Sequence, residues 1–242
     1  MTIDHKTRTQ INIGDRAAPL VVKINRRAKR LIVKVDQRSG EIIVTAPSAR
    51  AVSEAIEFAH NSADWIADQF DDRLRARAFA PDQTAPFRGE AHLLERTDSL
   101  RAPTIRITGE PPRIQTGGAP KHFNRRICDW MRKCARAALT EKSDEYCARL
   151  GVKRGQICIR DARTRWGSCS HDGALSYSWR LIMAPPAILD YVAAHECAHL
   201  VHMDHSRAFW RLLDSLGVDA RAAADWFKTH GGTLFAYGIE PS

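Results

Sequence analysis

Residues 191–205 read Tyr-Val-Ala-Ala-His-Glu-Cys-Ala-His-Leu-Val-His-Met-Asp-His, and this stretch decides both the fold and the chemistry. It contains the pattern H-E-x-x-H, with His195 and His199 four residues apart and Glu196 directly after the first histidine. In an α-helix, residues i and i+4 lie one turn apart on the same face, so both imidazoles can bind one tetrahedral zinc ion. Glu196 then lies beside that face, where its carboxylate can act as general base on a zinc-bound water. The pattern therefore predicts a zinc metallohydrolase.

A catalytic zinc site takes a third protein ligand and keeps one position open. If the helix continued, His202 would share the face of His195 but lie about 10 Å further along the axis. Zn–N bonds of about 2 Å cannot span that gap. His205 can fold back if the chain leaves the helix near residues 203–204, and its spacing equals that of the third histidine in the metzincin pattern. We therefore expect His205 as the third ligand. The alternatives that stay open are three downstream acids: Asp214, Asp219 and Asp225.

The elements around this helix are one long helix and several short strands. Apolar residues at helical spacing predict a helix over residues 123–150, with Gly151 as its stop signal. Short strands are expected over residues 156–160, 164–168 and 174–178. Pro185 and Pro186 open the next helix, because a proline in the first turn of a helix removes no needed hydrogen bond.

The N-terminal half is predicted to be a β-rich domain with one helix. Strand patterns over residues 20–24, 31–35 and 42–44 suggest a β-meander, and a helix is expected from the N-cap Ser48 to about Phe70. Residues 80–120 are rich in proline and glycine and end in Gly-Gly-Ala-Pro, so we place the domain boundary there. The expected fold class is α+β, with a β-rich domain over residues 1–118 and a zincin-like catalytic domain over residues 119–242.

Composition favours a globular protein made in the cytoplasm. The chain has 242 residues, of which 44% are hydrophobic, which is enough to bury a core. The start has no apolar signal region, and the most apolar stretch, residues 181–194, is broken by two prolines and an aspartate, so no membrane partner is expected. The six cysteines form no C-x-x-C pair and are expected to be reduced.

The net charge of +9 is unevenly distributed. Residues 121–165 contain thirteen Lys and Arg against five Asp and Glu, an excess of eight positive charges. A segment charged in this way can bind the backbone of a polyanion, which makes nucleic acid a candidate partner. The competing interpretation is a solvated helix face next to a core stripe.

Several motifs occur in a fixed order around the H-E-x-x-H pattern. They are Arg165-Trp166-Gly167-Ser168-Cys169-Ser170, Trp179-Arg180-Leu181-Ile182 with Ala184-Pro185, Tyr191-Val192, and His205-Ser206 before Phe209-Trp210. Together they closely resemble the YgjP-like metallopeptidase family, which is related to the SprT and WLM zinc proteases. The resemblance is strong from about residue 149 to 226 and looser in the N-terminal half. It implies peptidase activity on a peptide or protein substrate, zinc on His195, His199 and His205, and a catalytic Glu196. The family pattern usually has asparagine where this chain has Ser178.

Other side chains near the motif have two interpretations each. The Arg165 segment could be an edge strand that binds a peptide backbone while Arg165 holds a carboxylate or phosphate. Alternatively, Trp166 is a core anchor and Arg165 a structural ion-pair partner. Tyr191 and His230 are candidates for stabilising an oxyanion, with ordinary packing as the alternative.

The predicted mechanism is metal-assisted hydrolysis, in which zinc acidifies its water, Glu196 takes the proton and the metal polarises the scissile carbonyl. Two other functions remain open. One, which the relation to the SprT and WLM proteases suggests, is a DNA-associated protease that acts on proteins bound to nucleic acid. The other is a binding module in which zinc only stabilises the fold.

Overall fold

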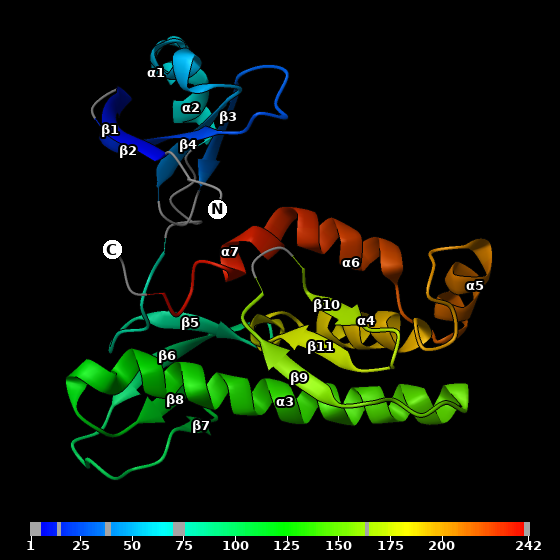
Figure 1. Cartoon of the computed structure of the whole chain (residues 1–242). Helices are drawn as coiled ribbons and strands as arrows, with labels where there is room; N and C mark the ends of the chain where they lie inside the picture. Colours follow the sequence, from blue (N-terminus) through cyan, green and yellow to red (C-terminus); the bar gives the residue numbers. More distant parts are fainter. Residues whose placement is uncertain (1–5, 14–15, 37–39, 70–75, 163–164, 240–242) are drawn as a thin grey trace. The chain divides into compact units, whose positions relative to one another are not determined.

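The computed structural model describes residues 6–13, 16–36, 40–69, 76–162 and 165–239. The chain forms two compact units that divide between Arg77 and Ala78 (Figure 1). Both units combine sheets with helices, so the fold is mixed α+β. The predicted helix end at Phe70 and the predicted strand start at Thr164 lie outside the described residues.

The first unit is a four-stranded sheet in the order β1-β2-β4-β3 with helices on one face. Its elements are β1 (Lys6–Ile13), β2 (Arg16–Ile24), β3 (Ile32–Asp36), β4 (Glu41–Ala46), η1 (Ala49–Ala51), α1 (Val52–Asn61) and α2 (Ala63–Gln69). The predicted meander is wrong, because β2 pairs in parallel with β4 and leaves β3 at the edge. Every second residue of β4 is buried, which suits a central strand, whereas β3 is largely exposed.

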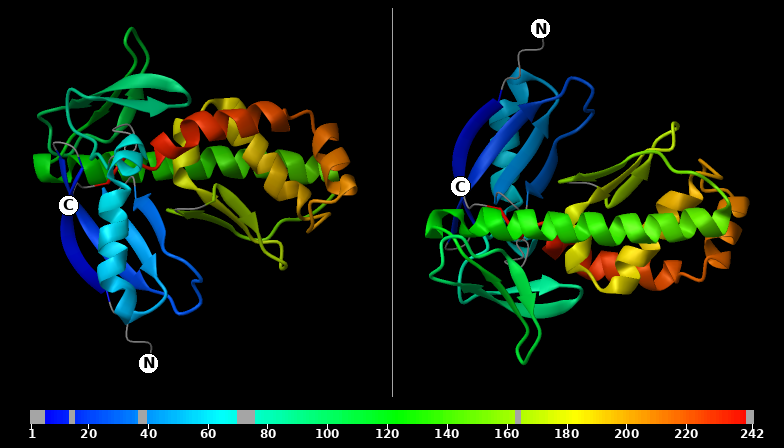
Figure 2. Two further views of the ribbon diagram at one scale, coloured as in Figure 1. Left: turned by 90° about the horizontal axis from the view of Figure 1, so that it is seen from above. Right: turned by 90° about the horizontal axis from the view of Figure 1, so that it is seen from below.

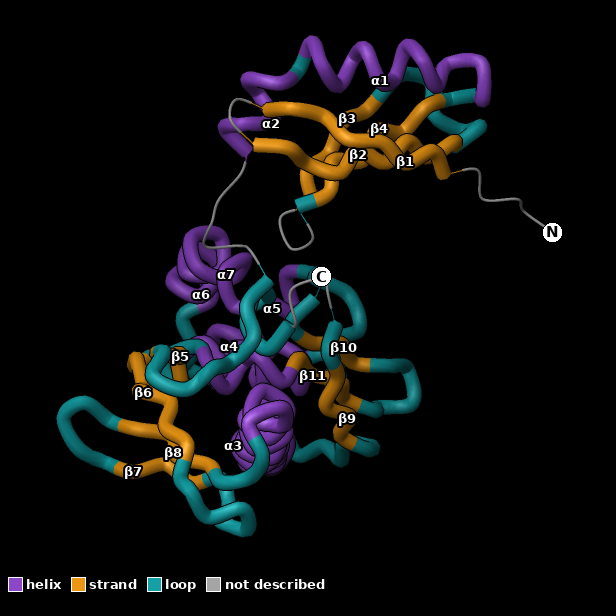
Figure 3. The backbone as a smooth tube through the Cα atoms, turned by 90° about the vertical axis from the view of Figure 1, so that its left-hand side faces the viewer, coloured by secondary structure: helices purple, strands orange, loops and turns teal. Residues whose placement is uncertain are grey.

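Two helices cover this sheet where the sequence predicts one. The break falls at Ser62, whose hydroxyl donates to the Phe58 carbonyl at 2.8 Å and so competes with the helical hydrogen bonds. Figure 3 shows α1 running across one face of the sheet. Ala55, Ala59 and Ile66 are fully buried against the sheet, which closes a small core.

The second unit is built around α3 (Phe123–Leu150), a helix of 28 residues. A four-stranded sheet, β5-β6-β8-β7, lies along its first half, and a three-stranded sheet, β10-β11-β9, lies along its second half (Figure 2). The remaining elements are β5 (Thr84–Phe87), β6 (Glu90–Arg96), β7 (Ile105–Ile107), β8 (Arg113–Thr116), η3 (Pro120–His122), β9 (Ile157–Arg160), β10 (Gly167–Cys169), β11 (Leu175–Ser178), η4 (Trp179–Met183), α4 (Pro186–Ala198), α5 (Arg207–Ser215), α6 (Ala220–Trp226), η5 (Phe227–Gly231) and α7 (Gly232–Leu234). The end of α3 agrees with the sequence, since Gly151 adopts a left-handed conformation with φ 67°.

The sheet β5–β8 belongs to the second unit, so the compact units divide about forty residues before the boundary expected at residue 118. The Phe87 ring lies 4.9 Å from the Trp130 ring of α3, and the Arg126 guanidinium donates to the Ala102 carbonyl and the Thr116 hydroxyl. A side chain at Gly117 would collide with the loop it packs against. The glycines there allow a tight connection between β8 and α3, and they do not form a linker.

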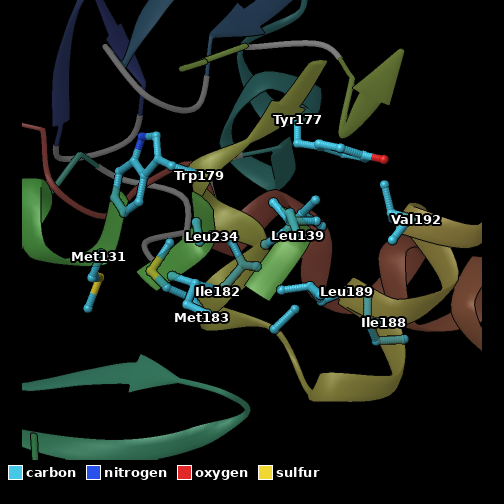
Figure 4. Close-up of a cluster of buried hydrophobic side chains, with 14 of the residues drawn as sticks. Met131, Leu139, Tyr177, Trp179, Ile182, Met183, Ile188, Leu189, Val192 and Leu234 are labelled. Carbon is cyan, nitrogen blue, oxygen red and sulfur yellow. The ribbon is translucent and has the colours of Figure 1, made fainter. Parts of the chain in front are cut away.

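The core of the second unit fixes α4 in place. Figure 4 shows side chains from α3, β11, η4, α4 and α7 gathered in one cluster. The labelled members are Met131, Leu139, Tyr177, Trp179, Ile182, Met183, Ile188, Leu189, Val192 and Leu234. Because α4 is buried on almost all sides, its last turn is rigidly held.

None of the described helices is long and apolar enough to cross a membrane. The six cysteines are free thiols, of which Cys128, Cys147 and Cys197 are buried.

Candidate metal centre

The H-E-x-x-H motif lies at the C-terminal end of α4. His195 and Glu196 belong to its last turn, and the helix ends at Ala198, one residue before His199. His199 keeps helical backbone angles (φ −65°, ψ −19°), and its N–H donates to the His195 carbonyl at 3.3 Å. The i, i+4 relation between the two imidazoles is therefore preserved at the point where the chain leaves the helix.

Three histidines converge beside this helix end. One ligand nitrogen from each of His195, His199 and His205 lies within 4.8 Å of the others. The Nε2 atoms of His195 and His205 are 3.2 Å apart. Two nitrogens bound tetrahedrally to zinc at about 2.0–2.1 Å would be about 3.3 Å apart, so the donor set fits zinc.

The turn after α4 brings His205 to this cluster. Asp204 accepts the backbone N–H of Ser206 at 3.2 Å, and the Ser206 hydroxyl accepts the N–H of Phe209 as the N-cap of α5. His205 lies between these two residues, whose hydrogen bonds fix the turn. Among the described residues, the histidine cluster includes none of the alternative acids, and Asp219 instead caps α6 by accepting the N–H of Ala222.

Hydrogen bonds orient two of the three imidazoles. The Nδ1–H of His199 donates to the His202 carbonyl at 3.0 Å, so Nε2 is the nitrogen of this ring that could bind a metal. His202 thus contacts the site through its backbone. The Tyr191 hydroxyl lies 3.5 Å from Nδ1 of His195, on the side of the ring away from Nε2. This contact favours an orienting role for Tyr191 over contact with an oxyanion.

Burial favours the neutral form of two of the three imidazoles. Burial, together with the neighbouring His199 and His205, lowers the pKa of His195 to about 4. Burial also lowers the pKa of His199. A neutral imidazole is the form that binds a metal, so both shifts reduce the competition from protons for the nitrogens of His195 and His199.

Glu196 lies buried against the edge strand β10. Burial raises the pKa of its carboxyl to about 7, although the nearby Arg165 and a hydrogen bond from the Cys169 N–H act in the opposite direction. A Cβ at Gly167 would lie 2.7 Å from Cγ and 2.8 Å from Cδ of Glu196. Only glycine lets the strand approach this carboxylate. The sequence places Gly167 in a strand, but its contact with Glu196 depends on tertiary packing and could not be found from the pattern.

Trp166 and His230 both pack against other aromatic rings. The Trp166 ring lies 5.0 Å from that of Phe227 and 4.5 Å from that of Phe235, which supports its interpretation as a core anchor. The exposed His230 stacks on Trp226 at 5.3 Å. Arg165 is exposed and close enough to Glu196 to influence its charge.

Several cationic side chains of the basic segment, residues 121–165, make contacts within the fold. On α3, Arg126 holds the loop before β7, Arg132 pairs with Asp129 at 3.1 Å, and Arg136 donates to the Ile157 carbonyl at 3.1 Å. Arg125 and Lys133 are exposed and line a surface cavity of about 340 Å³. Asp129 lines the same cavity, and the two exposed cations beside it are candidates for contact with a polyanion.

Comparisons with known proteins place the site in a family context. A family model described as YgjP-like, metallopeptidase domain, matches residues 29–230. A solved structure, described as the crystal structure of the metallopeptidase zymogen of Pyrococcus abyssi abylysin, is 21% identical with a TM-score of 0.34. The similarity covers 38% of this chain and 92% of that chain. The search of curated proteins gave no match.

Proposed function

Because this chain belongs to the YgjP-like metallopeptidase family, we propose that it hydrolyses peptide bonds with a zinc ion held by His195, His199 and His205. Glu196 is the general base. The observation that carries this proposal is a buried carboxylate next to three convergent imidazole nitrogens. A zinc ion bound there supplies a Lewis acid that polarises a carbonyl and lowers the pKa of water.

The residues of the chain perform the proton transfers. An Oε atom of Glu196 accepts the proton of the attacking water and then delivers it to the leaving amide nitrogen. The Cys169 N–H and the backbone at Gly167 hold this carboxylate in one position. Among the described residues, β10 is one of the two edge strands of its sheet, so its outer backbone groups can pair with an extended peptide.

If the protein were a binding module in which zinc only stabilises the fold, Glu196 would have no chemical role. A zinc site that only stabilises the fold needs a closed ligand set and gains nothing from an added buried carboxylate. Burying that group has a free-energy cost, which is why its pKa is raised. A costly group in a rigid position is expected at a catalytic site.

Metal removal tests the proposed function directly. Dialysis against a zinc chelator is expected to abolish cleavage of a casein-like substrate, and one equivalent of zinc should restore it. The measurement is proteolysis together with elemental analysis of the same sample. Hydrolysis that survives in protein shown to contain no metal would reject a metallopeptidase mechanism.

Nucleic acid is a second proposed partner, favoured by the cavity next to Arg125 and Lys133. We expect a single-stranded oligonucleotide to bind at low salt and to dissociate as salt rises. Arg125→Glu with Lys133→Glu should remove this binding. The matched control is Arg221→Glu with Lys228→Glu, which changes the charge equally on exposed positions of α6 and η5. Equal affinity in both double variants, measured by fluorescence anisotropy, would leave only the solvated-face interpretation.

A further inference from the structure

The C-terminal segment, residues 227–237, packs on the residue that precedes β10. Phe227 and Phe235 both lie against the Trp166 ring. Gly231 approaches the same indole so closely that a Cβ there would lie 3.4 Å from its Cζ2 atom. None of these three C-terminal residues belongs to the histidine cluster.

Arg180 anchors the same segment from inside the core. Its fully buried guanidinium donates to the Leu234 carbonyl at 3.1 Å and to the Tyr237 carbonyl at 2.9 Å. It also pairs with Asp161, which lies between β9 and β10. One side chain therefore joins the 227–237 segment to Asp161, directly after β9.

β10 connects Trp166 to Glu196. The Trp166 carbonyl accepts the Ser178 N–H at 2.8 Å, which fixes the start of the strand. The next residue, Gly167, touches the Glu196 side chain, and the Cys169 N–H donates to its carboxylate. From Phe235 to the carboxylate, the contacts pass through Trp166 and its neighbour in the chain.

We infer that the 227–237 segment is a positioning element for the carboxylate, and that Phe235 is a positioning residue acting through Trp166 and β10. The inference rests on the proposed role of Glu196 as general base. A displacement of about 1 Å at a reacting group can lower the rate about a hundredfold, so a loosened β10 should impair catalysis without removing a metal ligand.

The test compares Phe235→Ala with Phe87→Ala, which removes a buried ring from the same unit without a contact to β10. Phe235→Ala is expected to keep its zinc, to lose kcat tenfold or more with KM within about twofold, and to speed hydrogen exchange in residues 165–170. Phe235→Tyr should restore both kcat and exchange. Gly167→Ala places a methyl group against the Glu196 carboxylate and displaces it directly. The loss of kcat in this variant is the reference for the loss in Phe235→Ala.

Phe87→Ala, assayed well below its melting temperature, should keep kcat within about threefold and leave exchange in residues 165–170 unchanged. The inference is overturned if Phe235→Ala retains wild-type kcat and exchange, or if both phenylalanine variants lose activity equally. Hydrogen exchange does not depend on turnover. If wild-type protein cleaves no substrate, the proposed function fails, while the exchange comparison still decides whether the C-terminal segment holds β10.

Discussion

Glu196→Gln is expected to retain full zinc and a near-normal melting temperature while losing peptide hydrolysis by several orders of magnitude, since general-base catalysis alone contributes about 10²–10⁴-fold. Glutamine keeps the shape of the side chain, and its amide oxygen can still accept the Cys169 N–H. It cannot accept the proton of the attacking water. Zinc content, melting temperature and cleavage of casein-like or DNA-bound protein substrates should be measured on the same preparations.

The control for this variant is Glu145→Gln on α3. Glu145 is an exposed acid that pairs with Lys142 at 2.8 Å, far along the chain from the histidine cluster. Its loss should leave hydrolysis and zinc content unchanged, because exposed ion pairs contribute little to stability. Unchanged hydrolysis in Glu196→Gln would reject the general-base role, and a wild type inert on every substrate would favour the zinc-stabilised module.

Local patterns predicted the elements that carry the site. Helical spacing and Gly151 predicted α3, and the two prolines predicted the start of α4, because both signals act over a few residues. The i, i+4 spacing placed two imidazoles on one face by helix geometry alone. The return of His205 depended on the turn after Ala198, and the sequence indicated it only through spacing.

Features that depend on distant contacts were predicted poorly. The pairing of β2 with β4 joins residues about twenty positions apart, and no local pattern distinguishes it from a meander. The glycines and proline near residue 118 form a tight turn in the structure. The same residue types are also typical of a linker between domains, so the sequence does not distinguish the two. Only the packing of Phe87 and Arg126 shows that sheet β5–β8 belongs with α3.

Charge counting overestimated the surface available to a polyanion. The excess of eight positive charges over residues 121–165 is correct, but composition cannot show what each cation binds. Arg126 and Arg136 donate to backbone carbonyls, and Arg132 pairs with an acid one turn away. A test for nucleic acid binding therefore rests on Arg125 and Lys133.

The third ligand can be identified by comparing His205→Ala with His202→Ala. His205→Ala removes a nitrogen that lies 3.2 Å from Nε2 of His195, so its affinity for zinc should fall more than about 100-fold, beyond the usual effect of an outer-shell change. His202 contacts His199 through its backbone carbonyl, which an alanine retains. His202→Ala should therefore bind zinc almost as tightly as the wild type.

Elemental analysis and competition with a chromogenic chelator would measure both affinities. Because zinc binds the folded state, added zinc should raise the melting temperature of the wild type and of His202→Ala but not that of His205→Ala. Full zinc occupancy in His205→Ala would reject this ligand and return the choice to Asp214, Asp219 and Asp225. Of these three, Asp219 would have to give up its cap on Ala222, and Asp225 would have to reach the metal from within α6, so either choice would require a change around α6.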